Sequence, residues 1–216
     1  MKNPHMSFED PFYWISRAIR KIHSLWITWT YPFSAVGQRF SAHPTCDLRR
    51  SVAGFMRIGN SVLLEKNVRL DVPLVPKKEE LVILIGDGCV FGQRATILAI
   101  NRVEIEKNSI FAPSVMITDH NHEFEDITVP IREQGGTKGG TVRIEEGCWV
   151  GFGAAIVCSQ GELVIGKNSV IGASSLVTRS VPPYSVVTGN PARVVKHFDL
   201  EKREWVLGAA SPTPKR

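Results

Sequence analysis

Two histidines stand close together in the run Ile-Thr-Asp-His-Asn-His at residues 117–122. An imidazole can take up and return a proton near neutral pH, so His122 and His120 are candidates for a general base. Acidic side chains in the same stretch have the reach to orient one imidazole and fix its tautomer. These acids are Asp119, Glu123, Glu125 and Asp126. The alternative for an isolated His-x-His is two solvated loop histidines.

A metal site is not expected at these histidines. A zinc site needs a third ligand at suitable geometry, and the remaining histidines, at 5, 23, 43 and 197, offer no obvious partner. The four cysteines, at 46, 89, 148 and 158, form no C-x-x-C pair. We therefore expect neither a zinc site nor a disulfide framework, and a reducing cytoplasm is the default location.

A second group of candidates lies near the carboxyl end. Arg193 and Lys196 follow Gly-Asn-Pro at 189–191. Two cations at this spacing suit phosphate groups, which they would hold by charge-assisted hydrogen bonds. The alternative is ordinary surface charge.

The elements that must position these residues come from a six-residue repeat. Each copy starts with an apolar residue, often has a small or acidic residue second, and has a small residue or Cys fifth. The copies are 85–90, 91–96, 105–110, 111–116, 144–149, 150–155, 165–170 and 171–176. Tandem hexapeptides are typical of a parallel β-helix.

The repeat predicts which side chains point inward. Three six-residue sides make a triangular coil of about eighteen residues, and coils are stable only when stacked. The first residues of the repeats should form one column, with Ile85, Ile105, Ile144 and Ile165 in it. The fifth position has room only for a small side chain, which explains Cys89 and Cys148 as core residues. We predict an all-β chain of about seven coils between Ile58 and Val195.

Three segments fall outside the repeat. Residues 120–141 leave it altogether, and a loop of this length inside a compact domain is usually functional or disordered. Phe12–Trp29 has apolar residues at helical spacing, with Arg17, Arg20 and Lys21 between them. We expect this amphipathic helix to pack its apolar stripe on the first coil as a cap, and a helix lying on an anionic membrane is the alternative. A short C-terminal helix is expected at Asp199–Trp205.

Composition and charge limit the class of protein to which the chain can belong. The 216 residues are 43% hydrophobic, with a net charge of +5, and no apolar run is long enough to span a membrane. Residues 1–50 carry seven Lys/Arg against three Asp/Glu, so a basic end sits on a near-neutral body and nucleic-acid binding is not indicated. We expect three parts: 1–50, a helical and connecting extension; 51–196, the β-helix with its excursion loop at 120–141; and 197–216, the C-terminal helix and tail.

The repeats, the histidine-bearing loop and the ending Val-Thr-Arg-Ser-Val-Pro-Pro-Tyr-Ser-Val-Val-Thr-Gly-Asn-Pro-Ala-Arg-Val-Val-Lys at 177–196 coincide. Over roughly residues 52–200 the chain resembles the left-handed β-helix, hexapeptide-repeat acyltransferases, especially the bacterial polysaccharide and O-antigen O-acetyltransferases. The resemblance implies a left-handed solenoid, a homotrimer, acetyl-coenzyme A as co-substrate and no metal.

The resemblance also assigns roles to residues. The histidine five residues after Ile117, His122, is the first choice for the base, and His120 is the second. The coenzyme would lie along the solenoid between two subunits. Its contacts would be Phe152, Ala173, Thr178, Arg193 and Lys196. The backbone N–H of Phe152 is the candidate donor to the thioester oxyanion.

The expected reaction is direct transfer of an acetyl group to a sugar hydroxyl of a bacterial surface polysaccharide or its precursor. Arg94 stands where the galactoside and maltose enzymes have Asn, which argues against those acceptors. Arg94, Asp119 and Asn121 are the expected acceptor contacts. Two alternatives are an N-acetyltransferase of the same fold, acting on an amino sugar or antibiotic, and a non-catalytic β-helix scaffold. The expected location is the cytoplasm, with peripheral contact on the inner face of the membrane as an option.

Overall fold

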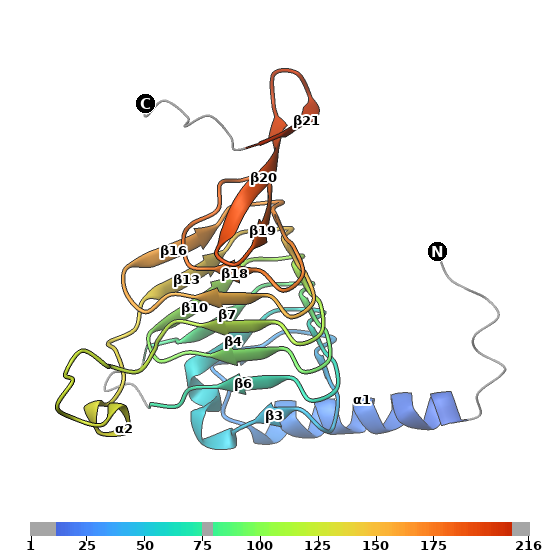
Figure 1. Cartoon of the computed structure of the whole chain (residues 1–216). Helices are drawn as coiled ribbons and strands as arrows, with labels where there is room; N and C mark the ends of the chain where they lie inside the picture. The colour runs from blue at the N-terminus through green and yellow to red at the C-terminus, as the bar shows by residue number, and fades with distance from the viewer. Residues whose placement is uncertain (1–11, 75–79, 209–216) are drawn as a thin grey trace.

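The structure is a computed structural model that describes residues 12–74 and 80–208. The strands form three sheets, here called A, B and C, that wrap a common core as a solenoid (Figure 1). Sheet A contains β1 (Ala35–Val36), β4 (Met56–Ile58), β7 (Ile83–Ile85), β10 (Arg102–Ile105), β13 (Thr141–Ile144) and β16 (Glu162–Ile165). Sheet C contains β3 (Asp47–Leu48), β6 (Arg69–Asp71), β9 (Thr96–Leu98), β12 (Met116–Thr118), β15 (Ala155–Val157) and β18 (Leu176–Val177).

Sheet B has six solenoid strands and three further strands at its end. The solenoid strands are β2 (Ser41–Ala42), β5 (Leu63–Leu64), β8 (Val90–Phe91), β11 (Ile110–Phe111), β14 (Trp149–Val150) and β17 (Val170–Ile171). They are followed by β19 (Ser185–Gly189), β20 (Ala192–Asp199) and β21 (Glu204–Leu207). The helices are α1 (Phe12–Thr30), a 3-10 helix at Arg50–Phe55, and α2 (Ile131–Gln134).

The predicted inward columns are present. Ile85 pairs with Ile105, Ile105 with Ile144, and Ile144 with Ile165, all in parallel register and all buried. The predicted small positions are buried as well; they include Cys89, Ala95, Ser109, Cys148, Ala154, Ser169 and Ser175. The bulky, fully buried side chains of Phe91 and Phe111 stack in adjacent coils, with parallel rings whose centroids lie 4.5 Å apart. Column packing of this kind is why the six-residue period specifies the fold.

The corners between sheets A and B require a left-handed backbone. Asn108 and Asn168 have φ near +60° and +51°, and Gly88 and Gly147 have φ near +70°. Glycine lacks a Cβ and asparagine tolerates this region, which explains their recurrence one position before the small core residue.

The solenoid begins earlier than expected. Strands β1–β3 pair in parallel with β4–β6, so the first coil starts at Ala35, inside the segment predicted as a connector to residue 50. Six complete coils run from β1 to β18, instead of the predicted seven between Ile58 and Val195, and β19 adds a strand to sheet B beyond them. This first coil was not predicted because strands of two residues, such as Ser41–Ala42, carry too little periodic signal.

Helix α1 lies across the end of the stack that starts with β1–β3, and projects past it (Figure 1). It begins at the predicted residue and ends one residue later than predicted, but the face that it turns to the solenoid is not the predicted one. Ser24 and Ile27 are buried against the first coil, whereas the apolar stripe expected to form the cap is exposed, including Ile22 and Trp29. No helix within the described residues has the length and apolar character needed to cross a bilayer.

The predicted C-terminal helix is wrong. Asp199 ends β20, a turn follows, and β21 returns antiparallel from Glu204. The Asp199 carboxylate accepts hydrogen bonds from the N–H groups of Glu201 and Lys202, which fixes the turn. Across the two strands Phe198 packs edge-on against Trp205, with ring centroids 5.6 Å apart. Cross-strand aromatic packing outweighs the helical propensity of this polar segment.

The buried thiols give a test of the core. Burial raises the pKa of Cys89 and of Cys148 to about 11. Because only the thiolate attacks a disulfide reagent, both thiols should be unreactive in the folded protein at mildly alkaline pH and should react fully in denaturant. Thiol titration with peptide mapping measures this. Rapid labelling of either cysteine in the native protein would contradict its place in the core.

Candidate active site

The excursion loop leaves the solenoid where sheet C turns toward sheet A. It begins after β12 and returns at β13, and an antiparallel bridge between His122 and Gly136 holds its two arms together. Thr137 accepts a hydrogen bond on Oγ1 from the Asn121 N–H (3.1 Å), and its own N–H donates to the Asn121 carbonyl (2.9 Å). Asn101 closes the neck by donating from Nδ2 to the Gly140 carbonyl at 2.8 Å. The histidine segment is therefore tied to the body of the solenoid.

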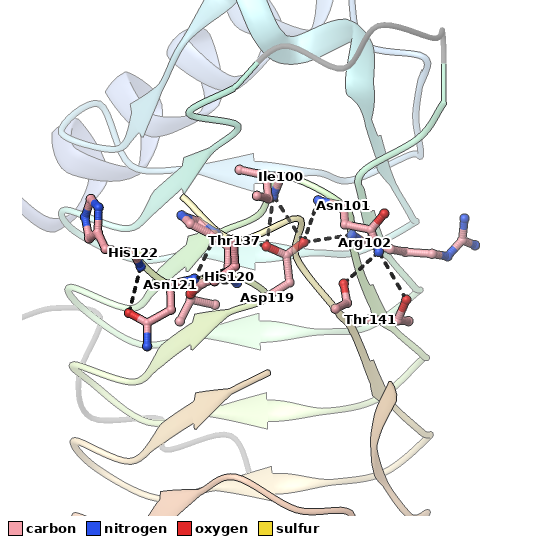
Figure 2. Close-up of polar contacts among 11 residues, drawn as sticks. Ile100, Asn101, Arg102, Asp119, His120, Asn121, His122, Thr137 and Thr141 are labelled. Carbon is pink, nitrogen blue, oxygen red and sulfur yellow. Dashed lines mark hydrogen bonds and ion pairs between the residues drawn. The ribbon is translucent and has the colours of Figure 1, made fainter. Parts of the chain in front are cut away.

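Asp119 is the centre of this arrangement. Its side chain is fully buried. The carboxylate accepts hydrogen bonds from the backbone N–H groups of Ile100 (2.9 Å), Asn101 (2.8 Å) and Arg102 (2.7 Å), which lie where the chain passes from β9 into β10 (Figure 2). Hydrogen bonds from several amides stabilise the ionised carboxylate in a buried position. Asp119 was expected to contact the acceptor, whereas in the structure its buried carboxylate contacts the backbone and His120.

His120 is the imidazole that Asp119 orients. Nδ1 of His120 lies 2.9 Å from Asp119 Oδ1, and the side chain is 20% exposed. An ionised carboxylate can only accept, so Nδ1 donates, and Nε2 is left with a free lone pair. Thr118 Oγ1 lies 3.2 Å from the same Nδ1. A partly exposed imidazole with a fixed tautomer has the form required of a general base.

His122 has a different environment. Its N–H donates to Asn121 Oδ1 at 3.0 Å, but its exposed ring has no hydrogen-bond partner in the described part of the chain. Figure 2 shows this ring pointing away from Asp119. Of the other loop acids, Asp126 bonds Thr128 instead of an imidazole, and that side-chain hydrogen bond lowers the pKa of Asp126. The geometry therefore favours the second choice, His120, over His122.

The expected coenzyme residues fall into two groups. Phe152 and Ala173 occupy equivalent corners of adjacent coils, two residues after the paired Val150 and Ile171. Phe152 is half exposed, and its N–H has no partner among residues 12–74 and 80–208. A Cβ at Gly151 would lie 2.7 Å from the Ala173 nitrogen, so glycine is needed for the coils to approach at this corner.

The second group lies at the end of the solenoid. Thr178 and Arg193 both line a hollow of about 170 Å³. Lys196 lies farther along β20, with its Nζ 5.4 Å from the centre of the Trp205 ring. The structure thus brings Thr178 and Arg193 together. It places Lys196 against Trp205, within the terminal hairpin that β20 and β21 form.

The histidine and Phe152 lie at opposite edges of sheet C. Pro113 is the equivalent of Phe152 in the histidine's own coil, because Phe111 pairs with Val150. Between Pro113 and His120 the chain crosses the sheet through β12, and the four residue steps from Val115 to Asp119 alone span roughly 13 Å at about 3.3 Å per residue. Within one chain, His120 and the Phe152 N–H therefore cannot contact the same reacting group.

Of the expected acceptor residues, only Asn121 remains beside His120 at the surface. Arg94 sits at the Phe152 edge of sheet C, with a φ of +61° and its Nε 3.3 Å from Ser114 Oγ. Sequence reasoning missed Asn101, Thr118 and Thr137, which hold the loop; the only available signal was their polarity at repeat boundaries. The described residues contain no group of three His, Cys, Asp or Glu side chains arranged to hold a metal ion.

In sequence, the chain is similar to proteins named as acetyltransferases. No family model matches the chain. It is 34% identical over 125 residues to a Mycobacterium tuberculosis protein named as an acetyltransferase, Rv3034c, covering 58% of this chain and 39% of that protein. It is 28% identical over 130 residues to WbbJ of Escherichia coli K12, named as a lipopolysaccharide biosynthesis O-acetyl transferase, covering 57% and 65%. The chain thus spans less than two thirds of the length of these relatives.

Among solved structures, the chain is similar to AntD, an N-acyltransferase from Bacillus cereus, in complex with dTDP and coenzyme A. The TM-score is 0.64 at 18% identity, covering 76% of this chain and 84% of AntD. At this identity the match establishes the fold. The tandem hexapeptides, the three-sheet solenoid and the similarity to proteins named as acetyltransferases agree with the resemblance to the hexapeptide-repeat, β-helix acyltransferases.

Proposed function

We propose that this protein transfers an acetyl group from acetyl-coenzyme A to a hydroxyl of a sugar in a bacterial surface polysaccharide or its precursor. The observation that carries the proposal is the Asp119–His120 pair, in which Nδ1 of a partly exposed imidazole lies 2.9 Å from a buried carboxylate oxygen. The similarity to WbbJ supports a surface-glycan acceptor. Because acetyl-coenzyme A is a cytoplasmic metabolite, the reaction belongs in the cytoplasm.

The chemistry is a direct transfer. Nε2 of His120 takes the proton of the acceptor hydroxyl while that oxygen attacks the thioester carbonyl. The carbonyl oxygen becomes an oxyanion, which the Phe152 N–H of a neighbouring copy of the chain would stabilise as a hydrogen-bond donor. When the tetrahedral intermediate collapses, the C–S bond breaks and the imidazolium returns its proton to the coenzyme thiolate. The products are the acetyl ester and free coenzyme A, and His120 regains its starting form.

The separation of His120 from Phe152 supports a site shared by two copies of the chain, in a homotrimer. His120 would come from one subunit. Phe152, Ala173, Thr178, Arg193 and Lys196 would come from its neighbour and hold the coenzyme.

An amine acceptor is the second candidate, because AntD, an N-acyltransferase bound to dTDP, shares the fold. A nucleotide sugar with a free amine and its hydroxyl counterpart, offered in competition, distinguish the two. Preferential acetylation of the amine would overturn the O-acetyltransferase proposal and leave the acyltransferase chemistry in place.

Replacing the base should abolish most of the activity. The His120→Ala variant should lower the acetyl-transfer rate by about a hundredfold to ten-thousandfold, the range for a lost general base. The matched His122→Ala variant should retain a rate close to that of the unmodified protein. Release of coenzyme A, followed with a thiol reagent, measures both. An inactive His122→Ala variant beside an active His120→Ala variant would reverse the assignment.

Asp119 is a positioning residue, and its effect should appear in kcat alone. Asp119→Asn replaces the carboxylate that fixes the His120 tautomer, so kcat should fall about a hundredfold while KM for acetyl-coenzyme A stays unchanged. Asp126→Asn, an exposed acid of the same loop, is the control and should have little effect. Equal losses in the two variants would indicate general disruption of the loop.

The proposed contacts with coenzyme A can be tested separately. Arg193→Ala with Lys196→Ala should weaken coenzyme A binding by about tenfold or more, since two charge-assisted contacts are lost. The loss should shrink as salt is raised. Calorimetry measures the affinity directly. Unchanged affinity would show that the coenzyme binds elsewhere.

The same double variant tests the shared site. Co-expressed with His120→Ala chains, it should recover part of the activity that each variant lacks alone, because one mixed interface then holds both intact halves. No recovery in mixed trimers would argue that each chain carries a complete site.

A further inference from the structure

Helix α1 is attached to the solenoid by one narrow face. Ser24 is buried there, and its Oγ accepts a hydrogen bond from the Ala42 N–H at 2.9 Å. Ile27, one turn on, is also buried. The Arg20 guanidinium forms two hydrogen bonds to the Glu65 carboxylate, at 3.0 and 3.2 Å. These contacts fix the rotation of the helix on the first coil and thereby decide which side faces outward.

The outward side of α1 is apolar. Its large exposed side chains are Trp14, Ile15, Ile19, Ile22, Leu25, Trp26 and Trp29. Ile22 is 67% exposed and Trp29 is 89% exposed. An amphipathic surface helix normally turns its apolar face to the core, and here that face is turned away from it. A contiguous apolar surface of this kind marks an interaction site.

Basic residues border this apolar face. Arg17 and Lys21 lie on α1, and residues 12–30 contain no Asp or Glu. A cleft of about 1280 Å³ between α1 and the first coil is lined by both residues and by Arg39. A tryptophan-rich apolar face with a cationic border is the composition of helices that lie in the interface of anionic membranes.

We propose that α1 docks the protein on an anionic lipid surface. The apolar face enters the acyl–headgroup boundary, and Arg17, Lys21 and Arg39 meet the lipid phosphates. Figure 1 shows α1 at the very end of the stack, so the described solenoid does not stand between the helix and a flat surface. A second copy of the chain is a poorer occupant, because it would bring the same positive border against itself, whereas an anionic surface neutralises it.

Vesicle sedimentation of the full chain tests this, with no substrate present, so the outcome is independent of the proposed reaction. The protein should pellet with vesicles of phosphatidylcholine and phosphatidylglycerol, and much less with phosphatidylcholine alone. Ile22→Glu should lower the partition constant by about tenfold or more, because a charge replaces an inserted apolar side chain. Leu200→Glu, the same kind of change on an exposed leucine of the terminal hairpin, is the control and should bind normally.

The cationic border is tested separately. Arg17→Gln with Lys21→Gln should reduce binding to anionic vesicles by about tenfold or more, and raised salt should have a similar effect on the unmodified protein. Failure of the unmodified protein to bind anionic vesicles would overturn the proposal. So would a halved molecular mass of Ile22→Glu in lipid-free solution, which would identify a second copy as the occupant.

Discussion

The backbone pairing between successive coils is the constraint on which every other feature depends. Each coil must return after its three sides so that an apolar side chain lies on its equivalent in the coil below, as Ile105 lies on Ile85 and under Ile144. A coil that slipped by one residue would turn its core side chains outward. Additional residues can therefore be accommodated only at a corner, and the long excursion between β12 and β13 leaves at a corner while both strands stay in register with their neighbours.

Such a departure exposes backbone groups that the next coil would otherwise pair. Asp119 takes up three of these N–H groups, at Ile100, Asn101 and Arg102. The same carboxylate then contacts His120. The residue that repairs the interrupted ladder is thus the residue that orients the imidazole, so the rigidity of the site comes from the solenoid instead of the loop. The neck formed by Asn101 and Gly140 has the same effect.

The sequence predicted the features that repeat and those with a strong local period. The isoleucine column, the small residues at Cys89 and Cys148, the place of the long loop and the bounds of α1 all follow from spacing. Features that depend on one contact could not be predicted. An amphipathic pattern does not say which face of α1 meets the solenoid, because the polar contacts of Ser24 and Arg20 decide it. Counting from Ile117 favoured His122, since the burial of Asp119 has no signature in one sequence. The terminal hairpin depends on Phe198 meeting Trp205 across a turn.

Because the coils stack at a fixed spacing, the solenoid acts as a ruler. Neighbouring strands lie about 4.8 Å apart. His120 follows β12, in the fourth coil, so it stands three spacings, or about 14 Å, above the coil on which α1 rests. The height of the imidazole above the first coil can therefore change only in steps of one coil spacing. A relative that opened its loop one coil earlier or later would reach a point about 4.8 Å lower or higher, with the same fold and the same chemistry. The position of such an imidazole along the solenoid can in this way be changed by moving a loop, without redesigning its surroundings.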